Sequence, residues 1–406
     1  MNKTNEYEGL VSKYISYKRA EGLKESTLGD LSGRLKMIGR ECGITCILDI
    51  ESKAIAGWFS QIAEPEREGE RAKRSAKTRL LLWKYGHGFM AWLVMRGDIP
   101  DNPIDDAPRP KNTKRDVRRK RRAFDIPELT NLFKIASLRP MAEYGKMRLI
   151  GSRNKAVWDS NPLTIENIDH YADHCRECLA RNPKELRRKE IDGRKWMLIY
   201  KTLLLTGLRW GELRSLEVNG ILLGENARIE LDASFTKNGN DASVPINEEL
   251  KIELSSWIKD RNLRNSDKLF NMPHKGMQRF NYDARAAGIA VKDERGRGID
   301  LHSLRRTFGT MLVRANVNVK VCQTAMRHAD VRMTMDIYAS CETAEVVHAV
   351  GLLPSFVVQP NASSVAQAIE PSQQPAIPTS PPIEAPRGLT PEEEMILAIF
   401  RNRRQS

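Results

Sequence analysis

Six residues in the second half of the chain have the side-chain types that attack on a phosphodiester requires. Such a reaction needs an in-line nucleophile, positive donors that hold the non-bridging oxygens, and an acid that protonates the leaving oxygen. Arginine suits the second need because its rigid fork binds phosphate oxygens in pairs. The candidates are Arg209, Lys237, His302, Arg305, His328 and Tyr338.

Two of these candidates lie at predicted turns. Arg209 follows a buried helix that ends in a Gly-flanked turn, and Glu212 lies three residues further on. Residues 228–234 and 243–246 alternate apolar with polar side chains around an Asn-Gly dipeptide, which predicts a β-hairpin. Lys237 would lie at the tip of that hairpin.

The other candidates follow in helical segments. His302 and Arg305 are one turn apart, so they share a helix face. Tyr338 comes ten residues after His328, with Thr334 between them. Taken alone, each of these residues could have a purely structural role, as a member of an ion pair, a structural histidine or a packing tyrosine. Their joint order favours catalysis.

This constellation resembles the tyrosine recombinase family, which includes the phage-type integrases. The resemblance covers residues 124–353, and the helical region before them looks like the core-binding domain of the same family. It is specific because it is collective, since a lone T-G-x-R-x-x-E or H-x-x-R segment occurs in many proteins.

The resemblance implies a role for each candidate cation and imidazole. Arg209 and Arg305 would hold the scissile phosphate. His302 and His328 would donate hydrogen bonds to its oxygens and help to move protons.

It also implies covalent chemistry without a cofactor. Lys237 would be the general acid toward the 5′-oxygen, and Tyr338 would attack the phosphorus to give a 3′-phosphotyrosyl link. That link conserves the ester energy, so neither ATP nor a metal ion is required.

Three positions depart from the family pattern. Ser303 stands where Asp is usual, Arg306 where His often follows the second Arg, and Arg327 where Gly usually precedes the second His. The stretch before Arg209 is also longer than usual. Residues 138–190, which are charged, interrupted by proline and without a clean period, are predicted to form an insertion.

A second cluster raises the alternative of a zinc site. His170, His174, Cys175 and Cys178 lie within nine residues. On one helix, however, Cys175 points away from the other three, and structural zinc sites usually draw ligands from two segments. An ordinary helix is the favoured interpretation, and no metal is expected.

Composition bounds the partners and the compartment. The formal charge is +14 and the isoelectric point about 9.5, which favours a polyanionic partner. The first residues carry no apolar signal segment, and six cysteines in 406 residues do not suggest a disulfide scaffold. A cytoplasmic protein of bacterial type, associated with the nucleoid and without a membrane partner, is expected.

The predicted fold class is mainly α with a small antiparallel β-sheet, an α+β catalytic domain preceded by an all-α domain. A helix capped by Ser26, a longer one over Ala76–Met95, and a helix start at Asp125 are expected. After the hairpin the pattern predicts helices as far as Leu353. The predicted parts are a helical core-binding domain at 1–104, a basic linker at 105–123, a catalytic domain at 124–353, a disordered linker at 354–389 and a short C-terminal helix at 390–406.

The leading hypothesis is a site-specific recombinase that integrates or excises a mobile element. By resemblance, its partners would be double-stranded DNA, a second copy on each site, a homotetramer in synapsis and a DNA-bending accessory protein. Residues 342–353 would pack on a neighbouring copy or on their own domain. A topoisomerase-like strand transferase, a non-catalytic DNA-binding regulator and a metal-dependent nuclease stay open as alternatives.

Overall fold

The computed structural model describes residues 6–65, 74–111, 120–146, 149–150, 156–157, 161–233 and 241–339. The chain divides into two compact units, Met1–Lys120 and Arg121–Ser406. The predicted fold class is confirmed, because the described residues are mostly helical and contain one small three-stranded antiparallel sheet. No helix in the described part of the chain is long and apolar enough to cross a membrane.

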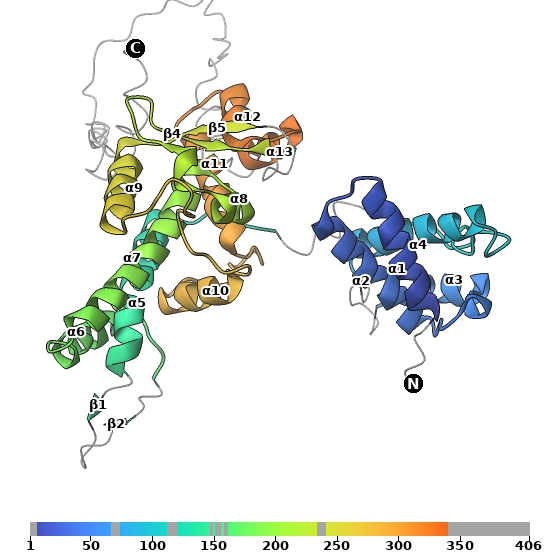
Figure 1. Ribbon diagram of the computed structural model, residues 1–406, viewed down its shortest axis with the longest axis horizontal. Coiled ribbons are helices and arrows are strands. Elements are labelled where there is room, and N and C mark those ends of the chain that lie inside the picture. Colours follow the sequence, from blue (N-terminus) through green and yellow to red (C-terminus); the bar gives the residue numbers. More distant parts are fainter. Residues whose placement is uncertain are drawn as a thin grey trace, which may run out of the picture. The chain divides into compact units, whose positions relative to one another are not determined.

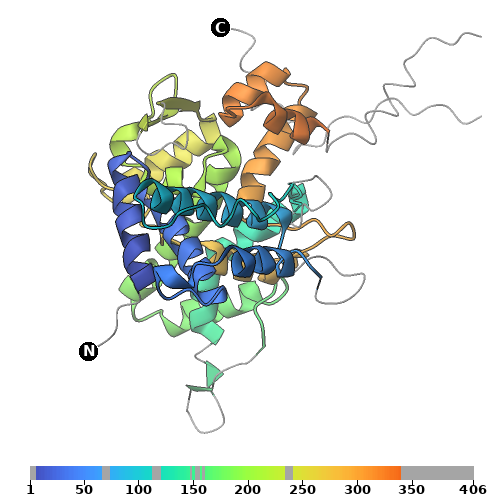
Figure 2. The ribbon, with the colours of Figure 1, turned by 90° about the vertical axis from the view of Figure 1, so that its right-hand side faces the viewer.

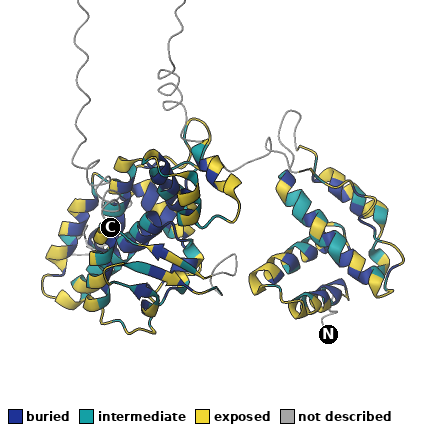
Figure 3. Ribbon diagram, turned by 90° about the horizontal axis from the view of Figure 1, so that it is seen from above, coloured by how far each residue is buried: buried dark blue, intermediate teal, exposed yellow. Residues whose placement is uncertain are grey.

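The first unit is a helical bundle. It contains α1 (Glu6–Ala20), α2 (Glu25–Glu41), α3 (Ser52–Gln61) and α4 (Ala76–Met95). Figure 3 shows buried positions gathered on the inward sides of these helices. Aromatic rings fill much of this core, with Tyr14 lying 5.3 Å from both Phe89 and Trp92 between ring centroids.

The predicted bounds of one of these helices are confirmed, whereas the predicted cap of another is wrong. The helix expected over Ala76–Met95 is α4, and Ser75 caps it by accepting a hydrogen bond from the Thr78 N–H. The expected cap at Ser26 is wrong, because α2 begins at Glu25 and its N-cap position is Lys24, which makes no side-chain cap. Packing of the apolar face, rather than a cap, therefore sets the start of α2.

The second unit surrounds a long central helix, α7. Its elements are α5 (Ile126–Lys146), β1 (Leu149–Ile150), β2 (Ala156–Val157), α6 (Ile168–Cys178), α7 (Pro183–Thr206), α8 (Trp210–Ser215), β3 (Ile221–Leu222), β4 (Arg228–Leu231), β5 (Ala242–Pro245), α9 (Glu248–Asp260), α10 (Met277–Ala286), α11 (Leu301–Arg314), α12 (Val319–Met326) and α13 (Val331–Tyr338). In Figure 1, α5 packs along one half of α7 and α6 packs against α5, while α8 and α11 lie toward the C-terminal end of α7.

The expected hairpin is present as β4 and β5, which pair antiparallel with Ile229 opposite Val244. β3 adds a third strand, with Ile221 opposite Ile229, that the sequence pattern did not reveal. Lys237 and its expected turn fall on residues 234–240, outside the described residues.

The region predicted as an insertion is partly regular helix. α5 continues to Lys146 through Pro140, and α7 already begins at Pro183, capped by Asn182. Residues 138–190 thus contain the end of α5, all of α6 and the start of α7, although their sequence shows no clean helical period; their status as an insertion stays a prediction. α5 tolerates the proline because it packs closely against both α6 and α7.

The prediction of helices after the hairpin is confirmed as far as Tyr338, and its continuation to Leu353 lies outside the described residues. The helices α9 to α13 are present, but residues 261–276 and 287–300 are irregular connections. Asp125 does start α5, since its carboxylate accepts the Glu128 N–H at 2.7 Å and Glu128 accepts the Asp125 N–H in return.

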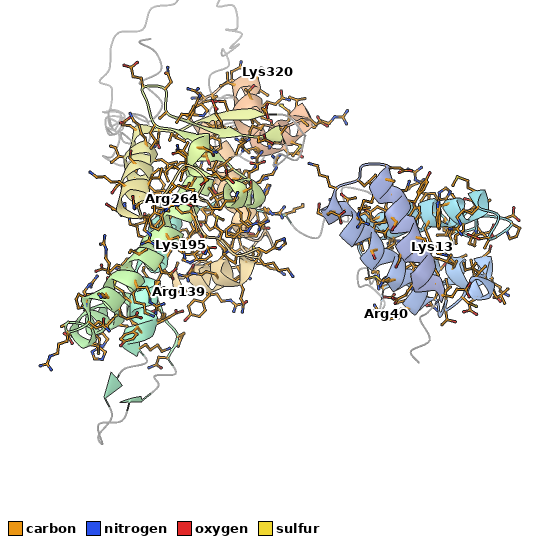
Figure 4. The ribbon with its side chains drawn as sticks, in the orientation of Figure 1. Lys13, Arg40, Arg139, Lys195, Arg264 and Lys320 are labelled. Atoms are coloured by element: carbon orange, nitrogen blue, oxygen red, sulfur yellow. The ribbon has the colours of Figure 1, made fainter. Side chains whose placement is uncertain are left out.

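A buried ionic cluster joins α5, α7 and α10. Asp283 is fully buried and accepts a hydrogen bond from the Tyr200 hydroxyl at 2.6 Å. It faces Arg139 at 3.1 Å and Arg279 at 3.7 Å. Arg139 reaches this cluster from α5 (Figure 4). The cluster fixes the three helices below the site described next.

Candidate active site

The turn that carries Arg209 depends on Gly207. α7 ends at Thr206, and Gly207 adopts a left-handed conformation with φ of 59°. A Cβ atom at this position would lie 2.5 Å from the Phe308 ring of α11. Glycine therefore permits both the turn and the close approach of α11, and the chain then places Arg209 at the N-cap of α8.

A buried carboxylate orients Arg209. Its Nη1 donates to Glu212 Oε1 at 2.6 Å, and its backbone N–H donates to Oε2 at 2.9 Å. Burial alone would raise the pKa of Glu212, but the hydrogen bonds from Arg209 hold that pKa below its usual value. The Arg209 side chain is 24% exposed and Glu212 only 2%, so a fixed guanidinium still faces solvent. The contact between Arg209 and Glu212 is therefore not a simple surface ion pair.

Arg305 connects three segments of the second unit. It lies on α11, is 2% exposed, and donates to the carbonyl oxygens of Gly207 and Met326. Burial, together with the positive charges of Arg209 and Arg327, lowers the pKa of Arg305 to about 9. Arg305 therefore lies near Arg209, and its hydrogen bonds join the end of α7 to the end of α12.

His302 lies one turn before Arg305 on α11, as predicted. Asp300 caps this helix by accepting the Ser303 N–H at 3.1 Å, and Ser303 Oγ accepts the Asp300 N–H at 3.0 Å. Ser303, which replaces the usual Asp of the family, therefore completes a capping box. Partial desolvation and the charges of Arg121 and Arg305 lower the pKa of His302 to about 4.

His328 lies in the turn between α12 and α13. Its Nδ1 forms a hydrogen bond with the Thr334 hydroxyl at 2.9 Å, which fixes the ring. Desolvation lowers the pKa of His328 to about 4, and the charges of Arg305, Arg209, His302 and Arg327 add to this effect. Both imidazoles are therefore neutral at pH 7, and each can donate one N–H.

Tyr338 ends α13. Its hydroxyl donates a hydrogen bond to the carbonyl oxygen of Val317, in the connection between α11 and α12. The ring packs against a small apolar cluster formed by α11, α12 and α13. Figure 2 shows the ribbon of these three helices in orange. The Tyr338 hydroxyl is thus hydrogen-bonded to the backbone of the connection between α11 and α12.

The structure brings Arg209, His302, Arg305 and His328 into one electrostatic neighbourhood, since the charges of the first three all lower the pKa of His328. Lys237 lies outside the described residues. Arg327 is a further member that the sequence marked only as a departure from the family. The sequence signal that could have identified Arg327 was an arginine at a position where the family usually has glycine.

The zinc alternative receives no support from the geometry. Within the described ranges, no three His, Cys, Asp or Glu side chains are grouped closely enough to hold a metal ion. The four residues lie on the ordinary helix α6, where Cys175 is buried and His174 Nε2 lies 3.5 Å from Cys178 Sγ.

Comparison with known proteins supports the same family. Residues 163–345 match the phage integrase family. The tyrosine recombinase XerA of Saccharolobus solfataricus is 34% identical over 139 residues, which cover 34% of this chain and 43% of that protein. XerA of Pyrococcus horikoshii is 25% identical over 178 residues, covering 41% and 60%. The chain spans about half the length of these curated relatives.

Solved structures show the same fold. A lambda integrase dimer bound to a COC′ core site superimposes with a TM-score of 0.53 at 16% identity, covering 81% of this chain and 76% of that one. A lambda integrase tetramer bound to a Holliday junction gives a TM-score of 0.53 at 15% identity, covering 83% and 78%.

Proposed function

We propose that the protein is a site-specific DNA recombinase, starting from the match of residues 163–345 to the phage integrase family. The observation that supports the proposal is that two arginines and a second imidazole, from segments about 120 residues apart, lie close enough to His328 for their charges to lower its pKa. Neutral imidazoles and fixed guanidinium groups suit a phosphate whose charge shifts during the reaction.

The proposed cleavage transfers a phosphoryl group from DNA to the protein. The Tyr338 oxygen attacks the phosphorus as its proton passes to one of the neutral imidazoles, His302 or His328, and the bond to the 5′-oxygen breaks. Arg209 and Arg305 hold the non-bridging oxygens, and Lys237 donates a proton to the leaving 5′-oxygen. The 3′-phosphotyrosyl bond replaces the ester that was broken, so the 5′-hydroxyl of another strand can reverse the step. Integration or excision of a mobile element would follow from two such exchanges.

The proposed partners are double-stranded DNA, a homodimer on each recombination site and a homotetramer in synapsis. Neighbouring folds support this, because their lambda integrase structures contain a dimer on a core site and a tetramer on a Holliday junction. A DNA-bending accessory protein and a cytoplasmic, nucleoid-associated location belong to the same proposal. The expected trans-packing segment at 342–353 lies outside the described residues.

The test uses nicked suicide duplexes taken from the flanks of the element that carries the gene. Wild-type protein should form a covalent adduct in the presence of a chelator, and peptide mapping should place the DNA on Tyr338. Tyr338→Phe should abolish the adduct, whereas Tyr17→Phe, which alters an exposed tyrosine of the first unit, should not. An adduct that persists in Tyr338→Phe would refute the proposal. DNA relaxation without any site requirement would indicate the topoisomerase-like alternative, and binding without cleavage the regulator.

A further inference from the structure

Arg327 occupies a backbone conformation that ordinarily favours glycine. It ends α12 with φ of 51° and ψ of 47°, in the left-handed region. This conformation costs a residue with a Cβ atom roughly 1–2 kcal/mol. Because the tyrosine recombinase pattern usually has glycine here, the arginine side chain must make contacts that offset the strain.

Those contacts converge on the turn that carries Arg209. Arg327 Nη2 donates to the Gly207 carbonyl oxygen at 3.0 Å and to Glu212 Oε2 at 3.2 Å. A longer contact of 3.5 Å joins Nη1 to the Thr206 carbonyl oxygen. The side chain is only 12% exposed, so these contacts are largely shielded from solvent.

Glu212 is consequently shared between two arginines. One of its oxygens accepts Arg209 Nη1 at 2.6 Å, while the other accepts the Arg209 N–H and Arg327 Nη2. A carboxylate that is held from two sides leaves Arg209 little rotational freedom. Through its bond to the Gly207 carbonyl oxygen, Arg327 also holds the turn that contains His328 against the end of α7.

We propose that Arg327 is a positioning residue for strand cleavage: it orients Arg209 through the carboxylate that they share and holds the His328 turn against α8. This inference rests on the recombinase function proposed above, but its contacts can be tested independently. It assigns Arg327 no contact with the DNA.

Arg327→Gly is the informative variant because glycine suits the backbone and removes the whole side chain. Asn262→Gly is the matched control, since Asn262 also adopts a left-handed conformation, with φ of 49°, at the end of α9. With a saturating suicide duplex, we expect Arg327→Gly to slow adduct formation at least tenfold while the Kd for DNA changes less than threefold. Arg327→Lys should recover part of the rate, because lysine keeps the charge but not the fork. Asn262→Gly should match wild type.

The second readout is the pKa of His328, followed by NMR of its ring protons in the free protein. The charges of Arg305, Arg209, His302 and Arg327 all lower this pKa. Removing Arg327 should therefore raise it, and Asn262→Gly should leave it unchanged. This measurement needs no catalysis, so it separates the present inference from the proposed function.

Wild-type cleavage by Arg327→Gly, or an unchanged His328 titration in that variant, would overturn the inference. If wild type formed no adduct while the His328 titration shifted as expected, the recombinase proposal would fail, and with it the role in cleavage. If Arg327→Gly did not fold, Arg327→Lys decides, and a wild-type rate with a normal Kd in that variant would refute the need for the fork.

Discussion

Replacing Glu212 by glutamine should destabilise the second unit by about 3 kcal/mol at pH 7. Glutamine keeps the shape but removes the charge that faces Arg209 at 2.6 Å and Arg327 at 3.2 Å. It also turns one acceptor oxygen into an N–H₂ donor that faces other donors. A hydrogen bond to a charged group contributes roughly 1.5–3 kcal/mol, and breaking a buried pair costs about 3–5 kcal/mol. Both guanidinium side chains are less than a quarter exposed, so solvent screens the loss only partly.

The stability lost in Glu212→Gln should be largest at neutral pH and smaller at acidic pH. Burial opposes ionisation of Glu212, yet its hydrogen bonds hold the pKa below the usual 4.5. The carboxylate therefore contributes its stability above pH about 4.5 and loses it as the pH falls through the lowered pKa. The difference between wild type and Glu212→Gln should be full at pH 7 and should shrink below that point.

Urea unfolding at several pH values tests this expectation, with slopes compared to confirm a single transition. Glu217→Gln is the control, because Glu217 forms an exposed pair with Lys268 at 2.8 Å and should leave the midpoint unchanged. Equal midpoints for Glu212→Gln and wild type at pH 7 would show that the shared carboxylate does not hold the site together. A loss that persisted unchanged at acidic pH would show that shape, not charge, is responsible.

Two further substitutions test the packing around the site. Gly207→Ala should lower the free energy of unfolding by about 2–3 kcal/mol, because strain at φ of 59° adds to a clash at 2.5 Å. Gly22→Ala, at φ of 83° in open space, should show the strain alone, so equal losses in the two variants would contradict the clash. Asp283→Asn should cost about 3 kcal/mol in urea unfolding, because it removes the only buried counter-charge that the described residues give Arg139, leaves the exposed Glu143 at 3.6 Å as its partner, and weakens the bond from Tyr200. A smaller loss than for an exposed carboxylate would refute that account.

Local signals made part of the fold readable from the sequence. The helix at Ala76–Met95 carried a series of large apolar residues, and the hairpin had alternation around Asn-Gly; the helix and both strands appear as expected. Asp125 was also identified as a helix start, and its reciprocal bonds with Glu128 explain why. In these places the local preference and the tertiary packing agree.

The region at 138–190 was not readable because tertiary packing overrides its local pattern. Gly145 lets the backbone of α6 approach α5 so closely that a Cβ atom would clash with the Tyr171 carbonyl. Gly193 does the same for the Ser137 carbonyl, where α5 crosses α7. Proline, glycine and charge obscure the helical period in the sequence, but these close approaches stabilise the helices.

The candidate site, too, could be predicted only in part from the sequence. Residue types and their order indicated which side chains belong together, because the order of motifs reflects the order of elements. They could not indicate that Arg327 turns back onto Glu212 and Gly207, since that contact depends on how the α12–α13 turn packs against α8. A departure from a family pattern named the residue, and only the fold supplied its partners.

Tyr338, the proposed nucleophile, and the two arginines depend on different packing, which bears on how the phenol would reach a phosphate. Arg209 and Arg305 are fixed to the α7–α8 turn by buried bonds, so moving them would disrupt several contacts at once. Tyr338 is held by a hydrogen bond to the Val317 carbonyl, and exchanging one such bond costs about 1 kcal/mol. Thr334, one turn earlier, is buried and bonded to the second histidine, so displacement of the whole of α13 would disturb the pocket. The least costly approach of the phenol therefore confines the movement to the last turn of α13.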